Sequence, residues 1–538
     1  MEQSKRKTGT LRTLCILIVF LLTIAPGFSG SLEPLEASEI KVFSISPAKP
    51  VFVGIERNPI LRIASYLPAE KQLTYKSIQA TLNETAVDDI EKLEVFFTGS
   101  EPMFADKRLI ATVHPASTDF DIPIDLNLDG GLHYLWISVT LKESADIDRK
   151  IELHCTGLTD SNNGTYRIAE EAADYAKRIG VAVRKAGDQG VDTYRIPGIA
   201  TTDKGTLIAV YDIRYDNSRD LPGNIDVGMS RSTDGGRTWE PMQIIMDMGA
   251  PHENNGVGDP SVLFDPATKT IWVAALWSKG NRSIAGSKPG LSPDETGQFV
   301  LVSSRDDGQT WTEVYSITEQ VKDPKWNLFF NGPGNGIVMQ DGKLVFPAQY
   351  WDENAMPHST IIYSEDHGKS WKSSIGPKSN TTESQVIETT PGTLMLNMRD
   401  NRGSWNNPGS FGSYRTVATT TNLGKDWTEH HSSYHALPDP VVMASIIKAN
   451  VIVNGTNREV VFFSNPNTTS GRYNMTLKAS VDLAESWPKE NHLLIDERMG
   501  YGYSALTRVD DHTIGLLYEG VKDLYFVRIP VKDIIRAN

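Results

Sequence analysis

Ser232-Thr-Asp-Gly-Gly-Arg-Thr-Trp239 is the first of five related octapeptides in the chain. The others, in the pattern Ser/Thr-x-Asp-x-Gly-x-Thr/Ser-Trp, occupy residues 304–311, 364–371, 420–427 and 480–487. In such an Asp box the Asp accepts backbone hydrogen bonds, the Gly takes a positive φ and the Trp packs between neighbouring sheets. Asn422 replaces the Asp in the fourth copy and Ala484 the Gly in the fifth, which puts those two turns in doubt. We interpret the boxes as structural, because they lack the additional carboxylates of a calcium site.

A second repeat interleaves with the boxes and consists of a turn followed by a hydrophobic strand. Its hydrophobic positions are Leu207, Ile271, Leu344, Leu394, Val460 and Ile514, separated by 64, 73, 50, 66 and 54 residues. A unit of about 60 residues suffices for a four-stranded antiparallel sheet, and sheets of this kind arranged radially make a β-propeller. The two repeats therefore predict an all-β chain with a six-bladed propeller over residues 181–538.

Composition places the chain among globular proteins of more than one domain. It has 538 residues, of which 39% are hydrophobic and 22% charged, as in proteins that bury a sizeable core. The formal net charge of −14 argues against a general attraction to nucleic acid or to anionic lipid. Nucleic-acid binding is therefore not expected.

The first thirty residues resemble a secretory signal peptide. Four basic residues precede an apolar run from Leu14 to Ile24, and small residues follow near Gly30. This pattern predicts cleavage and a secreted or periplasmic protein, with an uncleaved anchor as the alternative. The run is too short for a transmembrane helix, so we expect no integral membrane span after removal of residues 1–30. The mature chain then keeps Cys155 as its single cysteine, which excludes an internal disulfide.

Residues 31–157 read as short strands with alternating faces and predict a β-sandwich. Leu135, Ile137 and Val139 lie on one side of one such strand. On its other side, Tyr134 and Trp136 either stack on a sugar or pack against a neighbour. Residues 158–180 are polar and rich in Ala, and the helical spacing from 168 to 176 predicts a linker with a short helix.

Polar side chains are expected to gather at one rim of the propeller, where the first strand of each blade begins and the second ends. Counting back about 12 residues from each marker gives Arg195, Asp259, Gly332, Glu383 and Tyr503. Counting forward gives Asp212, Gln349, Arg399 and Glu519, with Arg214 and Trp277 close behind. This concentration of ionisable groups predicts a functional site at the rim.

The motif Tyr194-Arg-Ile-Pro197 resembles the opening of the catalytic domain of exo-α-sialidases, and the resemblance continues over about 350 residues. It implies Asp220 as acid/base, Tyr503 as nucleophile and Glu383 as its partner. The arginines matching the family's carboxylate clamp are Arg195, Arg399 and Arg472, with Arg214 as an extra arginine and Glu519 as the carboxylate that holds the first. Asp259, Gln349 and Trp277 complete the expected substrate-binding set. Glu388 and Asp216 are nearby carboxylates that stay open as alternatives.

The resemblance implies hydrolysis of terminal α-linked sialic acids on glycoproteins, glycolipids or oligosaccharides, without cofactor or metal. Guanidinium groups suit a planar carboxylate because they donate two parallel hydrogen bonds and keep their charge. A neutral tyrosine avoids the repulsion that a carboxylate nucleophile would meet at an anomeric carbon bearing a negative group. Sialidases are a known exception to the scheme of two catalytic carboxylates.

Two other functions remain open at this point. A trans-sialidase, intermolecular or intramolecular, would use the same centre with acceptor-site aromatics such as Trp277 and Tyr350. A non-catalytic sialoglycan-binding propeller would be expected to lack Asp220, Glu383 or Tyr503, and all three are present. For the sandwich, a carbohydrate-binding module and a structural buttress are equally open.

Overall fold

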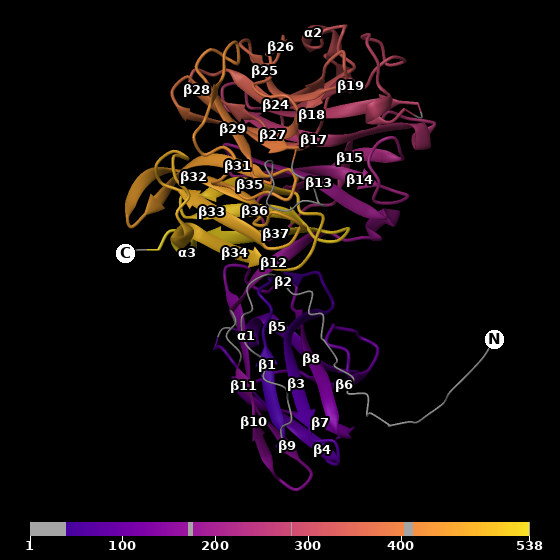
Figure 1. The fold of residues 1–538 in the computed structure, drawn as a ribbon, viewed down its shortest axis with the longest axis vertical. Helices are drawn as coiled ribbons and strands as arrows, with labels where there is room; N and C mark the ends of the chain where they lie inside the picture. The colour runs from indigo at the N-terminus through magenta and orange to yellow at the C-terminus, as the bar shows by residue number, and fades with distance from the viewer. Residues whose placement is uncertain (1–38, 85, 171–175, 281, 403–412, 537–538) are drawn as a thin grey trace, which may run out of the picture.

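The chain forms two β units, a sandwich followed by a larger propeller (Figure 1). The computed structural model describes residues 39–536 except 85, 171–175, 281 and 403–412. The predicted signal peptide lies outside the described residues. Within the described part of the chain, no helix is both long and apolar enough to cross a membrane.

The sandwich has two sheets facing each other across a hydrophobic core. The first contains, in spatial order, β11 (Ala169–Glu170), β1 (Lys41–Ile45), β3 (Asn58–Leu67), β8 (Gly131–Leu141), β5 (Ile90–Gly99) and β6 (Leu109–Val113). The second contains β12 (Ala176–Arg184), β9 (Lys150–Asp160), β4 (Leu73–Leu82) and β7 (Asp119–Leu128), with β10 (Thr165–Arg167) on β9 and β2 (Val51–Val53) on β12. A short helix, α1 (Ala86–Asp89), leads into β5.

The alternating pattern in the sequence accounts for this core. Leu135, Ile137 and Val139 are fully buried on β8, and Cys155 of β9 is a buried free thiol. On the opposite face of β8, Tyr134 and Trp136 are 8% and 9% exposed, and the guanidinium of Arg62 covers both rings. These two aromatic rings therefore pack against neighbours, which was one of the two alternatives for them.

The connector is a β-strand instead of the expected linker helix. Residues 169–170 form β11, and β12 pairs with β9 at its start and with β37 (Leu524–Pro530) of the propeller farther along. Hydrogen bonding to two partner strands outweighs the local helical spacing, which is a weak preference. Residues 171–175 of the expected helix lie outside the described residues. One continuous sheet thus joins the two units.

The propeller consists of six radially arranged sheets in the described residues, as the repeats predict (Figure 1). Blades one to three contain β13 (Thr193–Thr201), β14 (Leu207–Arg214), β15 (Ile225–Ser232) and β16 (Gln243–Met246); β17 (Asn255–Asp265), β18 (Thr270–Lys279), β19 (Gln298–Ser304) and β20 (Tyr315–Ser316); and β21 (Leu328–Asn331), β23 (Ile337–Val338), β24 (Leu344–Trp351), β25 (Pro357–Ser364) and β26 (Lys372–Ser373). Blades four to six contain β27 (Thr381–Thr390), β28 (Thr393–Asp400), β29 (Thr416–Thr420) and β30 (Thr428–Glu429); β31 (Ser445–Val453), β32 (Thr456–Pro466), β33 (Met475–Ser480) and β34 (His492–Asp496); and β35 (Ser504–Asp510), β36 (Thr513–Glu519), β37 and β12. Strand β22 (Gly334–Asn335) joins the second blade, and helices α2 (Thr318–Val321) and α3 (Val531–Ile534) are single turns.

The Asp boxes form the expected turns, including the two that depart from the pattern. In the first, Asp234 accepts hydrogen bonds from the backbone and hydroxyl of Thr238, at 3.0 and 2.6 Å. Asn422 of the fourth box accepts the equivalent backbone bond at 3.0 Å. Ala484 of the fifth keeps a left-handed φ of 74° and donates its N–H to Ser480. Trp239 packs on Phe526 of blade six, which fits its expected role between blades.

The sandwich unit also packs directly on the sixth blade. Phe52 of β2 is 1% exposed and stacks on Tyr525 with ring centroids 4.0 Å apart. Asp148 accepts a 2.6 Å hydrogen bond from Arg528 of β37. These contacts are those of a buttress; glycan binding by the sandwich stays a prediction.

Replacing Phe52 by alanine is expected to lower the free energy of unfolding by about 3–5 kcal/mol, because it leaves a cavity between the two units. Urea unfolding followed by tryptophan fluorescence measures this loss. Met103→Ala is the control, since this side chain is 74% exposed and its loss should cost less than about 0.5 kcal/mol. Equal effects of the two substitutions would show that the sandwich does not support the propeller.

Candidate active site

Three of the predicted rim residues, Arg195, Asp259 and Glu383, lie where the first strand of a blade is interrupted by a β-bulge. Register shifts occur between Arg195 and Gly198 in β13, between Gly258 and Ser261 in β17, and between 381 and 384 in β27. Ile196 and Asp259 have a φ of 57°, which a side chain larger than glycine rarely adopts. A bulge bends its strand and redirects side chains, so these interruptions aim polar groups at the rim.

Tyr503, just before β35, is the centre of the cluster. Its hydroxyl donates a short hydrogen bond to Glu383 of β27, and Arg399 of β28 donates to the same hydroxyl at 3.1 Å. Arg399 also binds Glu383 at 2.6 Å. Glu383 and Arg399, which precede Tyr503 by 120 and 104 residues in the sequence, therefore meet at its phenol oxygen.

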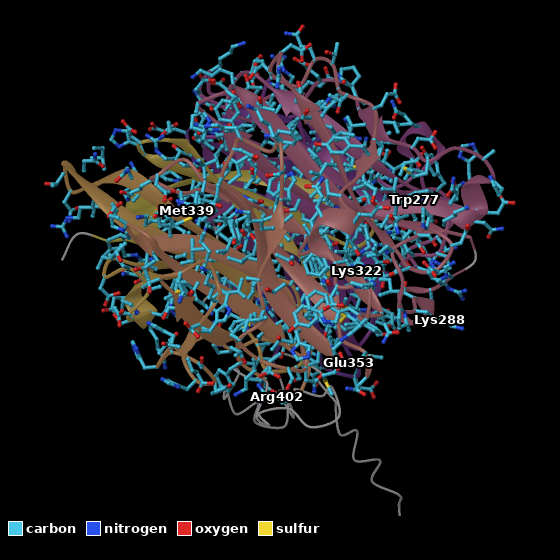
Figure 2. The ribbon with its side chains drawn as sticks, turned by 90° about the horizontal axis from the view of Figure 1, so that it is seen from above. Trp277, Lys288, Lys322, Met339, Glu353 and Arg402 are labelled. Carbon is cyan, nitrogen blue, oxygen red and sulfur yellow. The ribbon has the colours of Figure 1, made fainter. Side chains whose placement is uncertain are left out.

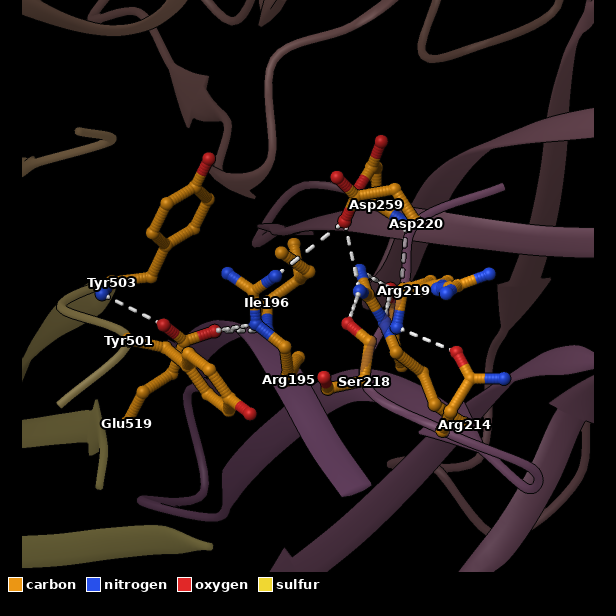
Figure 3. Close-up of polar contacts among 12 residues, drawn as sticks. Arg195, Ile196, Arg214, Ser218, Arg219, Asp220, Asp259, Tyr501, Tyr503 and Glu519 are labelled. Carbon is orange, nitrogen blue, oxygen red and sulfur yellow. Dashed lines mark hydrogen bonds and ion pairs between the residues drawn. The ribbon is translucent and has the colours of Figure 1, made fainter. Parts of the chain in front are cut away.

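Two further arginines flank the Tyr503 ring. The guanidinium carbons of Arg195 and Arg472 lie 5.3 and 5.6 Å from its centroid. Glu519 at the end of β36 fixes this arrangement, since it accepts hydrogen bonds from Arg195 Nε at 3.1 Å, from the Ile196 amide and from the Tyr503 amide, both at 2.9 Å (Figure 3). One buried carboxylate thus positions an arginine and the tyrosine together.

Electrostatics in the cluster keep the arginines charged and the phenol neutral. Burial tends to lower the pKa of Arg195 and Arg399, but Glu519 and Glu383 outweigh it and raise both above the ordinary value. Burial and Glu383 raise the pKa of Tyr503 well above its usual range, against the opposing effect of the arginines. The free protein therefore holds a neutral Tyr503 that donates its proton toward Glu383.

Asp220 lies in the loop after β14 and faces the cluster from the first blade (Figure 3). Its carboxylate accepts hydrogen bonds from Arg214 at 2.8 Å and from Arg195 at 3.4 Å. Partial desolvation by the surrounding rim would raise the pKa of Asp220, but these two guanidinium groups outweigh it and hold that pKa below the usual value. Asp220 is also 67% exposed at its side chain, so it can meet a group arriving from solvent.

Asp259 is a half-buried residue close to Asp220 (Figure 3). Its amide donates to Asp212 at 2.8 Å, and its carbonyl accepts a 2.6 Å bond from Asn331. Burial, then the charges of Asp212 and Asp220, raise its pKa well above the usual range. Asp259 therefore keeps its proton to a higher pH than an ordinary carboxyl, and in its protonated form it can donate a hydrogen bond to a ligand hydroxyl.

Gln349 and Trp277, two expected binding residues, make no hydrogen bond or ion pair with the cluster. Gln349 is 3% exposed within β24. Trp277 belongs to the second blade (Figure 2). Its indole N–H donates to Asn255 at 2.8 Å. Tyr350, the other aromatic considered for an acceptor site, is covered by Trp326 and His358, whose rings stack on it at 4.1 and 4.7 Å.

The two alternative carboxylates lie outside the cluster. Glu388 is at the far end of β27, where it accepts the backbone N–H groups of Gln340 and Gly392 in two turns. Asp216 is an exposed residue of the loop that carries Asp220. Neither Glu388 nor Asp216 therefore replaces Asp220 or Glu383 beside Tyr503 and its arginines.

Two residues of the site were assigned no chemical role from the sequence, although the repeat count placed one of them, Asp212, at the rim. Asp212 accepts two hydrogen bonds from Arg214, at 2.8 and 3.0 Å, and so orients it toward Asp220. Tyr501 places its ring 4.7 Å from the Arg195 guanidinium. A signal exists for Asp212, because residues two apart on a strand share a face. No comparable signal marks Tyr501.

Three carboxylates of this cluster, those of Asp220, Glu383 and Glu519, are each bound by an arginine. Within the described residues, one group has donor atoms close enough together for a metal ion, namely His430, His431 and Glu485 beside the fifth Asp box. Their donor atoms lie within 4.8 Å of one another. The rim thus combines a group of arginines, a neutral phenol that donates its proton to a carboxylate, and a carboxyl that faces solvent.

Models of two protein families match the chain. Residues 196–491 match a BNR repeat-like domain, and residues 37–164 match the N-terminal domain of BNR-repeat neuraminidase. A sialidase of Bacteroides fragilis is 41% identical over 91% of this chain and 96% of its own length. A sialidase of Micromonospora viridifaciens is 32% identical over 62% of this chain and 50% of its own length.

Solved structures agree with these matches. The Hadza microbial sialidase Hz136 is similar with a TM-score of 0.84 and 38% identity, over 91% of this chain and all of that one. A Trypanosoma rangeli sialidase, solved with 2,3-difluorosialic acid as a covalent intermediate, has a TM-score of 0.52 and 22% identity, over 69% of this chain and 56% of that one. The latter likeness concerns the fold.

Proposed function

The chain belongs to the sialidase family of glycoside hydrolases, and we propose that it releases terminal α-linked sialic acid with retention, through a covalent intermediate on Tyr503. The observation that carries this proposal is the contact of the Tyr503 hydroxyl with Glu383 and Arg399, between the guanidinium groups of Arg195 and Arg472. A phenol in this setting has a base to take its proton and cations to stabilise the phenolate.

The arginines would bind the substrate carboxylate before any bond changes. Arg195, Arg399 and Arg472 converge on one point of the rim, and guanidinium groups bind planar carboxylates through charge-assisted hydrogen bonds. Asp259 would donate a hydrogen bond to a hydroxyl of the bound sugar. The substrate's anomeric carbon then lies over Tyr503.

In the first step the Tyr503 oxygen attacks the anomeric carbon while its proton passes to Glu383. The bond to the leaving sugar oxygen breaks, and Asp220 protonates that oxygen. In the second step Asp220 takes a proton from water, the hydroxide attacks the anomeric carbon, and Tyr503 leaves and recovers its proton from Glu383. Two inversions at the same carbon give overall retention.

Substrate binding has to change the state of Asp220. In the free enzyme Arg214 and Arg195 hold the pKa of Asp220 low, so the carboxyl is ionised at neutral pH and cannot act as an acid. A substrate carboxylate bound by Arg195 neutralises part of that positive charge. Because the guanidinium then stabilises the ionised form of Asp220 less, the pKa of Asp220 rises. Binding therefore prepares Asp220 for proton transfer.

The test is incubation with the α2,3- and α2,6-linked sialyllactose isomers, followed by proton NMR. We expect free sialic acid, released first as the α anomer, which then converts to the β anomer in solution. First appearance of the β anomer would contradict retention. Anhydro-sialic acid or a transferred product would instead indicate a trans-sialidase, for which the covered Tyr350 offers no acceptor platform.

The expected natural substrates are sialoglycoproteins, gangliosides and sialyl-oligosaccharides, and the proposed location is outside the cytoplasm. The location depends on the signal-like residues 1–30 and is checked by N-terminal sequencing of the protein recovered from its host's periplasm or medium. An uncleaved N-terminus in the cytoplasm would overturn it.

Arg399→Lys is expected to lower kcat/KM by about 30- to 1,000-fold, corresponding to about 2–4 kcal/mol, because one ammonium cannot replace a bidentate guanidinium. Steady-state kinetics on sialyllactose measures the change. Arg402→Lys is the matched control, because Arg402 pairs with Asp400 instead of the tyrosine. A change within threefold for Arg399→Lys would refute its place in the clamp.

A further inference from the structure

A cavity of about 560 Å³ lies at the junction of the two units and has a strongly basic wall. Its polar lining consists of Lys49, Lys150, Lys177, Arg178, Lys532 and Arg536, with Asp533 as the one acidic side chain in that described lining. Strands β12 and β34 and helix α3, which contribute to the wall, come together at this junction (Figure 1). Such a concentration of cations is unexpected in a chain with a net charge of −14.

The lining itself neutralises little of this charge. Asp533 is bound by Arg178 at 2.6 Å and by Lys150 at 3.3 Å. Lys177 is engaged by the carbonyl of Pro47. Lys532 and Arg536 form no ion pair with any described residue. The wall therefore presents a positive potential to whatever enters the cavity.

Lys49 is the most unusual member of the lining. It is 7% exposed, and its ammonium makes no hydrogen bond or ion pair with any residue that the structure describes. Burying a charged group without a partner costs free energy, and such groups in native proteins usually bind a counter-charge. An anion seated in the cavity would provide the missing partner.

We propose that this cavity, the junction pocket, binds a small sugar that carries a sulfate or phosphate ester. The ester would take hydrogen bonds from Lys49 and the neighbouring cations, as oxyanions do from charged donors. The pocket's volume falls within the range of small-molecule sites, about 300–1,000 Å³, and exceeds what one inorganic oxyanion needs. Pro50, Leu493 and Ile495 supply apolar wall for the body of the sugar.

The junction pocket is separate from the catalytic rim. No arginine of the clamp lines it, and neither do Asp220, Glu383 or Tyr503. A ligand there would contact β12, which belongs to both units, together with α3 after the last blade. Binding should therefore stabilise the docking of the sandwich on the propeller without changing the chemistry.

Isothermal titration of the whole mature protein with glucose 6-sulfate and glucose 6-phosphate tests the proposal. Inorganic sulfate and unmodified glucose serve as comparisons. We expect one site per chain, tighter binding of at least one ester than of inorganic sulfate, and no binding of glucose. The ester that binds more tightly shows whether the pocket prefers a sulfate or a phosphate group. Failure of both esters to bind overturns the proposal, as does equal binding of glucose.

Lys49→Met assigns the binding to the pocket. It should weaken the preferred ester at least tenfold, yet leave the unliganded protein at least as stable, since methionine fills similar space without a charge. Lys76→Met, an exposed lysine of β4 paired with Asp125, is the matched control and should change neither quantity. Lys532→Met, at the exposed side of the wall, is a second test that does not depend on a buried substitution. Unchanged affinity in both pocket variants would overturn the assignment.

The affinity of the junction pocket for the sulfate ester should also depend on pH. Burial, and then Arg498, lower the pKa of Lys49 to about 7; Lys177 acts in the same direction, while Asp496 and Glu497 oppose it. The ammonium is thus lost as pH rises through about 7, and the affinity should fall with it, because sulfate itself does not titrate there. Hydrolysis of a small sialoside should be unaffected by Lys49→Met, so failure of this inference and failure of the proposed function are distinguishable.

Discussion

Tyr503→Phe is expected to lower kcat/KM for sialyllactose by about 1,000-fold or more. The variant keeps the ring between Arg195 and Arg472 and loses the oxygen that receives the sialyl group. Nucleophile removal in enzymes has effects of this size, with residual rate from binding and electrostatics. Steady-state kinetics on the purified, folded variant measures the loss.

Tyr501→Phe is the control for this substitution. It leaves the ring near Arg195 and removes a hydroxyl that has no role in the proposed reaction. Its kcat/KM should stay within about threefold of the parent. A Tyr503→Phe variant as active as Tyr501→Phe would rule out a tyrosine nucleophile.

Covalent trapping examines the same assignment directly. A 2,3-difluorosialic acid probe, which slows breakdown of the intermediate, should label the parent protein on Tyr503, as peptide mass mapping would show. The Tyr503→Phe variant should stay unlabelled. Labelling of Glu383, or an active enzyme that is never labelled, would exclude the proposed intermediate while leaving sialidase activity to the substrate assay.

Asp220→Ala is expected to slow hydrolysis of sialyllactose by about 10²–10⁴-fold and to spare aryl sialosides with good leaving groups, because these need little protonation. The ratio of kcat/KM between the two substrate types is the readout. Asp216→Ala, in the same loop but outside the arginine contacts, should leave both rates unchanged. An equal loss on both substrate types would mean that Asp220 acts in binding and not as the acid.

The fold was predictable because its information is local and repeated. An octapeptide such as Ser232–Trp239 specifies its own turn, and its recurrence with the strand markers specifies the number of sheets. The fourth and fifth boxes show how much variation the turn tolerates: Asn422 has the same acceptor oxygen as Asp, and Ala484 adopts the left-handed φ at a cost that its packing offsets. The fourth and fifth boxes could therefore be recognised from the overall pattern, although each departs from it.

The rim residues to which we assign catalytic and binding roles were predictable for a different reason. Their positions in the repeat place Arg195, Glu383, Arg399, Tyr503 and Glu519 at one rim, and their order along the chain resembles that of sialidases. The structure brings these five into contact. Gln349 and Trp277 satisfied the same count, yet neither makes a hydrogen bond or an ion pair with the described residues of the cluster. A position in a repeat places a residue at the rim but does not set the direction of its side chain, so their part in substrate binding stays a prediction.

Sequence patterns therefore predicted the number of blades, the alternating faces of the sandwich strands and the identities of the rim residues. Each of these features depends on residues close together within one strand or turn. The tertiary structure was needed wherever distant segments compete for the same backbone. Helical spacing at 168–176 gave no hint that residues 176–184 would form β12, because that strand exists through its pairing with β9 and β37. The bulges that aim Arg195 and Asp259, and the buried ammonium of Lys49 at the junction, likewise arise from the packing of whole sheets, which no local pattern records.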